Sequence, residues 1–297
     1  MRIVEWIRAS QAILFEASIL PAIVGTAAAI HGGAPFRAVP LGLILLSLIG
    51  IQAGANLLKG YFEGRDRSSP PSSPGSWFAF DSAAAVHLTR DPRTVLRLGR
   101  LSFAIGVGAG LLLVLLTMNL ALLLFGIAGA VLAWSYSSPP LQLSYRGVGE
   151  ISTFLAFGPI MTVGATVAFG GAGIRDSLFA SVVLGLLASA ISFARYFPNR
   201  AEDSEKGKRT PVTSLGFPGA RRLFLGLPLL PVPFGFIWWF FGGGVLWILL
   251  TVAFWIAILR AFPKEETASR FDRAIAWTVA AHAFVGLAIV VDLFVGL

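Results

Sequence analysis

The chain has 297 residues, of which 56% are hydrophobic and only 13% are charged, and its mean hydropathy is +0.79. This composition excludes a soluble globular domain and indicates an integral membrane protein. The absence of cysteine excludes disulfides, thiolate metal sites and a cysteine nucleophile. The net charge of +8 would suggest nucleic acid in a soluble protein, but here we expect no nucleic-acid partner and examine its distribution among the loops.

Nine apolar runs of about 20 residues follow one another along the chain, and each is long enough to cross a bilayer as an α-helix. We therefore predict an all-α membrane protein with nine transmembrane helices, forming a single domain over residues 1–297. Continuous runs favour helices over barrel strands, whose polarity would alternate. The predicted spans are 10–30, 38–59, 97–117, 119–136, 151–170, 177–196, 222–241, 244–262 and 274–296.

Positive charge is concentrated on one side of this arrangement. All but two of the 23 Lys and Arg lie before the first span or in and around the loops after spans 2, 4, 6 and 8, and only Arg37 and Arg175 fall on the other side. This asymmetry predicts a cytoplasmic N-terminus and an outside C-terminus, in a multi-pass protein of the inner or cell membrane. The long polar connections at about 60–96 and 197–221 share the cytoplasmic side, so we expect the active site there.

The second predicted span ends in the polar stretch ANLLKGYFEGRDRSS at 55–69. Asn56, Lys59 and Glu63 are spaced three and four residues apart, so they share one face of a helix, and Asp66 continues that face. A solvated helix end is one interpretation of this pattern, because polar residues are common where a span leaves the bilayer. A functional site is the other.

Three glycines lie close together in the third predicted span: Gly106, Gly108 and Gly110. Their spelling resembles a phosphate-binding loop, but they are surrounded by apolar residues. We therefore interpret all three as points of close helix packing.

A second polar cluster, NRAEDSEKGKRT, follows the sixth predicted span. Asn199 and Asp203 are four residues apart, on one helix face, and Lys206, Lys208 and Arg209 come next. Oxygen ligands at helical spacing suit Mg²⁺, which binds a few carboxylates together with the oxygens of a phosphate. Lysine and arginine suit the remaining phosphate charge. A solvated helix end again stays open as the alternative.

Taken together, these features resemble the UbiA superfamily of intramembrane prenyltransferases, and most of all its branch that prenylates dihydroxynaphthoate in menaquinone biosynthesis. The most specific segments are SYRGVGEISTFLAFGPIMTVG at 144–164 and FPNRAEDSEKGKRTPVTSLG at 197–216. The resemblance implies transfer of a polyprenyl group, within the lipid bilayer, from a polyprenyl diphosphate donor to a small aromatic acceptor. It also implies two Asp-rich motifs that hold Mg²⁺ and the diphosphate.

The first motif departs from the family pattern Asn-Leu-x-Asn-Asp-Tyr-x-Asp. Lys59 replaces Asn, Gly60 replaces the first Asp and Glu63 replaces the next, while in the second motif Asn199 replaces an Asp. One hypothesis is that Lys59 contacts the diphosphate directly and reduces the number of metal ions needed. The opposing hypothesis is a catalytically altered relative that binds a lipid diphosphate, a quinone or a partner protein; a terpene cyclase of the same fold is also compatible.

The resemblance assigns roles to individual residues. Tyr145 or Glu150 would orient or deprotonate the acceptor, although Arg146 and Glu150, four residues apart, fit a structural ion pair equally well. The expected metal ligands are Asn56, Glu63, Asp66, Asn199 and Asp203. The expected diphosphate-binding residues are Lys59, Arg146, Lys208 and Arg209.

Overall fold

The computed structural model describes residues 3–64, 78, 85–86, 89, 91–265 and 271–295, so Asp66 and most of the 60–96 connection lie outside the described residues. Every regular element in the described ranges is helical. The helices are α1 (Ile3–Ala9), η1 (Ala12–Leu14), α2 (Glu16–His31), α3 (Ala38–Gly64), α4 (Pro92–Thr117), α5 (Ala121–Ser135), η3 (Leu143–Tyr145), α6 (Gly149–Leu155), η4 (Ala156–Ile160), α7 (Met161–Ala168), α8 (Ile174–Tyr196), α9 (Arg200–Glu205), α10 (Pro211–Gly226), η5 (Leu227–Leu229), α11 (Pro231–Phe240), α12 (Leu246–Ala261) and α13 (Phe271–Val295).

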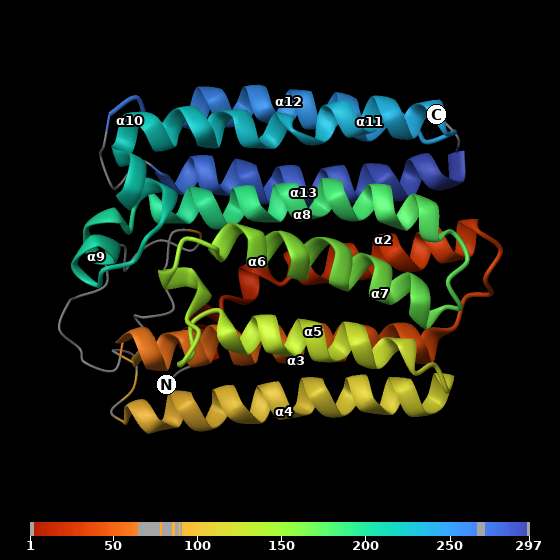
Figure 1. Ribbon diagram of the computed structural model, residues 1–297, viewed down its shortest axis with the longest axis horizontal. Coiled ribbons are helices and arrows are strands. Elements are labelled where there is room, and N and C mark those ends of the chain that lie inside the picture. Colours follow the sequence, from red (N-terminus) through yellow and green to blue (C-terminus); the bar gives the residue numbers. More distant parts are fainter. Residues whose placement is uncertain are drawn as a thin grey trace.

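The long helices lie side by side in a bundle with their axes roughly aligned (Figure 1). In this view α10 to α12 form one border of the bundle and α4 forms the other; α8 and α13 lie next to α10 to α12, and α2, α6 and α7 lie near the middle. Helix α9 lies at one end of the bundle and the C-terminal end of α13 lies at the other. The polar motif in α9 and the C-terminus therefore lie at opposite ends of the bundle.

Seven helical stretches in the described residues are long and apolar enough to cross a membrane. They coincide with seven of the nine predicted spans. The other two predicted spans, 119–136 and 244–262, are the apolar helices α5 and α12, which have 15 and 16 residues. The prediction of an all-α bundle of membrane-spanning helices is therefore confirmed at this level.

Two of the long stretches contain local breaks. The fifth predicted span consists of α6, the π-helical turn η4 and α7, with Pro159 inside the π-helical turn. Proline removes a helical hydrogen bond, which explains why the regular α-helix is interrupted there. The seventh begins earlier than predicted, at Pro211, and is bent where Gly216 adopts a positive φ of 66°. Only glycine adopts this conformation without strain.

Helices α3 and α4 pack backbone to backbone through glycines. A side chain at Gly50 would come within 2.8 Å of the Gly106 Cα atom, and a side chain at Gly106 would come within 2.6 Å of the Ile51 nitrogen. The prediction of close helix packing is thus confirmed for Gly106. It is wrong for Gly108, which has no atom of another element within 4 Å and faces away from α3.

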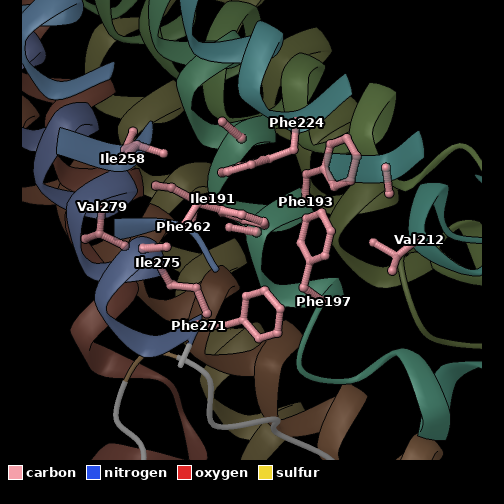
Figure 2. Packing of buried hydrophobic residues seen from close by; sticks show 14 of the residues in the cluster. Ile191, Phe193, Phe197, Val212, Phe224, Ile258, Phe262, Phe271, Ile275 and Val279 are labelled. Atoms are coloured by element: carbon pink, nitrogen blue, oxygen red, sulfur yellow. The ribbon is translucent and has the colours of Figure 1, made fainter. Parts of the chain in front are cut away.

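An aromatic cluster fixes the end of the bundle that carries the second motif. Phe197, two residues before Asn199, stacks on Phe193 and Phe271 at centroid distances of 5.7 and 5.5 Å and meets the edge of Phe262 at 4.8 Å. Figure 2 shows these rings converging from α8, α13 and the end of α12. Aromatic rings at these distances pack favourably beyond their simple burial. The cluster therefore holds the start of the second motif against a rigid core.

Candidate functional site

A cavity of about 340 Å³ lies between α3, α4, α5, α7 and α8. Along α3 its wall runs from Ile44 to Lys59, fifteen residues apart, which corresponds to about 22 Å of helix. Most of the wall is aliphatic or aromatic and includes Leu122, Phe125 and Ala165. A long apolar space of this kind suits an extended hydrocarbon chain.

Two cations mark one end of this cavity. Lys59 reaches it from the last turns of α3 and Arg195 reaches it from the last turn of α8. The Arg195 Nη1 atom donates to the Gln11 Oε1 atom at 3.1 Å, and Gln11 also lines the cavity. The site thus combines an apolar cavity with a cationic end, which is the arrangement that an amphiphilic anion requires.

Polar side chains of α3 form hydrogen bonds with the backbone between α1 and α2. Gln52 donates to the Leu14 carbonyl at 3.0 Å, and Asn56 donates to the Ser10 carbonyl at 2.8 Å. Between these two contacts Gln11 adopts a left-handed conformation with φ of 55°. This conformation is uncommon for a residue other than glycine, so the two hydrogen bonds help to keep Gln11 at the mouth of the cavity.

The two predicted motifs meet through an ammonium group. The Lys208 Nζ atom lies 2.7 Å from Glu63 Oε2 of the first motif and 3.0 Å from Asp203 Oδ1 of the second. The three side chains are only 5%, 1% and 4% exposed. The structure therefore brings Glu63, Asp203 and Lys208 together as a buried ion triad.

The loop after α9 fixes the position of Lys208. Its backbone nitrogen donates to the Asp203 carbonyl at 2.8 Å, and its carbonyl accepts a hydrogen bond of 2.7 Å from the Thr213 hydroxyl. The preceding Gly207 has φ of 68°, which allows the tight turn. The ring of Tyr145 lies 5.1 Å from the Lys208 Nζ atom. Within this distance the face of an aromatic ring attracts a cation.

Further lysines surround the triad. Lys59 Nζ lies 4.0 Å from the same Glu63 oxygen that Lys208 contacts. Lys206 donates to the Glu63 backbone carbonyl at 3.0 Å and pairs with Glu202. The first motif is therefore enclosed by ammonium groups, and its own Lys59 connects the triad to the cavity.

The remaining predicted residues occupy different places. Asn199 donates to the Arg195 carbonyl at 3.0 Å, so it supports the end of α8. Arg146 is exposed and donates to the Pro140 carbonyl at 3.1 Å; it forms no ion pair with Glu150, and that alternative is wrong. Arg209 is exposed, with its backbone nitrogen bound to the Tyr145 carbonyl.

Glu150 lies beside a short row of hydroxyl groups. A side chain at the neighbouring Gly149 would come within 2.8 Å of the Tyr196 hydroxyl, which places that hydroxyl beside this turn of α6. The Tyr136 hydroxyl lies 3.3 Å from both the Tyr196 hydroxyl and the Ser192 hydroxyl, and Tyr136 and Ser192 line the cavity. The row leads from the cavity wall toward Glu150. Glu150 itself is not among the described residues that line the cavity.

Sequence reasoning missed the cavity residues Gln11, Tyr136 and Arg195. They come from three separate parts of the chain and share no motif, so their spacing contained no signal. Arg195 offered the one available sign, because it lies within a predicted span and is followed four residues later by Asn199. An ionisable residue within a span is a functional candidate by default.

The donor groups of the triad can be compared with the ligands that Mg²⁺ prefers. Magnesium prefers six oxygen ligands in octahedral geometry, whereas the two carboxylates here already share an ammonium group. The Glu63 Oε1 atom is buried and has no hydrogen-bond partner among the described residues. In the described ranges no three His, Cys, Asp or Glu side chains are grouped to hold one. The described donor set therefore does not fit a Mg²⁺ site.

Comparison with known proteins agrees with this architecture. Residues 81–291 match the sequence model of the UbiA prenyltransferase family. The chain is 28% identical over 232 residues to a 1,4-dihydroxy-2-naphthoate octaprenyltransferase of Mycobacterium tuberculosis, an alignment that covers 75% of this chain and 74% of the relative.

Solved structures show the same fold. A UbiA homologue from Archaeoglobus fulgidus bound to GPP and Mg²⁺ superposes with a TM-score of 0.69 at 15% identity, over 97% of this chain and 99% of that one. The apo structure of a UbiA homologue from Aeropyrum pernix superposes with a TM-score of 0.68 at 16% identity, over 94% and 99%. Similarity at this level of identity concerns the arrangement of the helices.

Proposed function

The chain belongs to the UbiA prenyltransferase family, and we propose that it transfers a polyprenyl group from its diphosphate to a small aromatic acceptor inside the membrane. One observation carries this proposal: the long apolar cavity ends at two cations, Lys59 and Arg195. The apolar wall would hold the isoprenoid chain and the cations would hold the diphosphate. The relative from Mycobacterium tuberculosis supports a dihydroxynaphthoate acceptor and a place in menaquinone synthesis.

We place nine spans in the membrane, with α5 and α12 as short crossings. An α-helix rises 1.5 Å per residue, so these two helices are about 22 to 24 Å long, which suits a thinned or locally adapted bilayer. The distribution of Lys and Arg supports a cytoplasmic position for α9 and for the cationic end of the cavity. The donor and the acceptor would then reach the site from the cytoplasmic half of the membrane.

The reaction requires heterolysis of the allylic C–O bond. The bonding electrons leave with the diphosphate, so negative charge develops on the α-phosphate oxygen that was bonded to carbon, while an allylic cation forms on the carbon. Lys59 and Arg195 would stabilise the departing diphosphate, because fixed positive groups in a water-poor site act strongly on developing charge. The lysine provides a compact charge and the arginine provides a planar set of donors.

The acceptor ring then forms a C–C bond to the allylic carbon and must lose a proton. Tyr136 is on the cavity wall, and its hydroxyl connects to that of Tyr196 beside the Glu150 turn. We assign Glu150 as the final proton acceptor, reached through these hydroxyls rather than by direct contact. Tyr145 is less well placed to act as the base, because it is not among the described residues that line the cavity.

The test is product formation by the purified protein in nanodiscs. Labelled geranylgeranyl and longer polyprenyl diphosphates are supplied with dihydroxynaphthoate, and prenylated product and released diphosphate are measured. We expect product from at least one donor, with Lys264→Ala as an active control, since Lys264 is exposed and is not among the described residues that line the cavity. Saturable donor binding without any product would instead support a relative that binds a lipid diphosphate, and a hydrocarbon product without acceptor would support a cyclase.

A further inference from the structure

We propose that the Lys208 ammonium takes the place of a divalent cation between the two motifs, so that this chain binds a prenyl diphosphate without Mg²⁺. The inference deepens the proposed function and rests on it for the chemical class of the donor. It begins from the buried triad, in which one ammonium bridges a carboxylate of α3 and a carboxylate of α9.

The triad is a built feature and not a chance contact of a mobile lysine. Both carbonyl and nitrogen of Lys208 are held by hydrogen bonds, and its ammonium lies over the ring of Tyr145. With side-chain exposure of 5% for Lys208 and 1% for Glu63, water cannot screen the pair effectively. Moving the ammonium aside would leave two buried carboxylates, so a metal ion would have to displace an already compensated charge.

Among the described residues, ammonium groups lie against both carboxylates of the triad. Glu63 and Asp203 contribute two negative charges, and Lys208 and Lys59 contribute two positive charges within 4.0 Å of the same carboxylate or of its partner. A Mg²⁺ ion added here would face two ammonium groups at short range in a site of low dielectric.

Two cations lie on the cavity wall. Lys59 and Arg195 line the cavity, whereas Lys208, Glu63 and Asp203 are not among the described lining residues. Lys208 therefore acts without touching the diphosphate. Its ammonium neutralises the carboxylates of Glu63 and Asp203, which would otherwise repel a diphosphate. Lys59 and Arg195 then make the direct contacts.

The experiment measures binding, in nanodiscs, of an unreactive thio analogue of geranylgeranyl diphosphate with Mg²⁺ or with a chelator, and binding of Mn²⁺ by electron paramagnetic resonance. For the wild type we expect analogue affinities within about twofold of each other in the two conditions and no stoichiometric Mn²⁺. In Lys208→Ala we expect one bound Mn²⁺ per chain and analogue binding at least about tenfold weaker in chelator. Lys208→Arg should behave as the wild type, and Lys264→Ala is the control for lost surface charge.

The inference is overturned if the wild type binds Mn²⁺ stoichiometrically or loses analogue affinity tenfold in chelator. These wild-type measurements decide the question even where Lys208→Ala fails to fold. Retained analogue binding in chelator without product from any acceptor would remove the proposed reaction and leave this inference standing. Product formed only with Mg²⁺, together with loss of analogue binding in chelator, would do the reverse.

Discussion

At the scale of single residues, the function depends on the two cations of the cavity wall. Lys59→Ala and Arg195→Ala should each lower kcat/KM for the donor by about 10- to 100-fold, because a hydrogen bond to a charged group contributes roughly 1.5–3 kcal/mol. The measurement is initial rate against donor concentration in nanodiscs. An unchanged kcat/KM in both variants would show that the diphosphate binds elsewhere.

The same scale includes the hydroxyl row beside the cavity. Tyr136→Phe removes the hydroxyl that lies 3.3 Å from Tyr196 and from Ser192, while it keeps the ring that packs on the wall. If Glu150 receives the acceptor proton through this row, kcat should fall by about 100-fold with little change in the binding of the donor analogue. Equal rates in Tyr136→Phe and wild type would exclude the relay.

At the scale of helices, the α3–α4 pair provides a matched comparison within one helix. Gly106→Ala puts a methyl group within 2.6 Å of the Ile51 backbone nitrogen, so the helices must separate, and we expect a loss of about 1–3 kcal/mol in stability. Gly108→Ala meets no atom within 4 Å and should be neutral or stabilising by up to about 1 kcal/mol, since Ala is the better helix former. Thermal unfolding in detergent tests both.

The outcome that contradicts this account is equal unfolding temperatures for the two variants. Gly108 is the internal control, because it lies two residues further along the same apolar helix and differs only in the face that it presents. Since Gly106 contacts backbone atoms, which cannot rotate away as a side chain can, the destabilisation should persist in different detergents.

At the scale of the whole molecule, the chain contains no cysteine, which permits single-cysteine labelling without background. We expect Ser204→Cys, exposed on α9, to react with an impermeant maleimide only after the membrane is opened. Pro35→Cys, exposed between α2 and α3, should react from outside in intact cells. The opposite pattern would invert the proposed topology and place the cationic end of the cavity outside.

The sequence was informative where chemistry and spacing lie within one segment. Apolar run lengths predicted the helices, and the family resemblance predicted that Glu63, Asp203 and Lys208 belong to one site. The structure places the two carboxylates 2.7 and 3.0 Å from the Lys208 ammonium, and the roles of these residues in binding stay predictions. Spacing within each cluster did not show that Lys208 joins the two motifs, since that contact spans 145 residues. Arg195 and Gln11 were missed for the same reason, because only the packing of α8 against the turn between α1 and η1 brings them together.

The most direct test of the account is the position of the unreactive donor analogue in an experimental structure of the protein in nanodiscs. We predict that its diphosphate lies between Lys59 and Arg195 and that its chain extends past Phe125 toward Ala165. A diphosphate bound at the exposed Arg146 and Arg209, with the isoprenoid outside the cavity, would contradict the assignment of the cavity as the site of prenyl transfer.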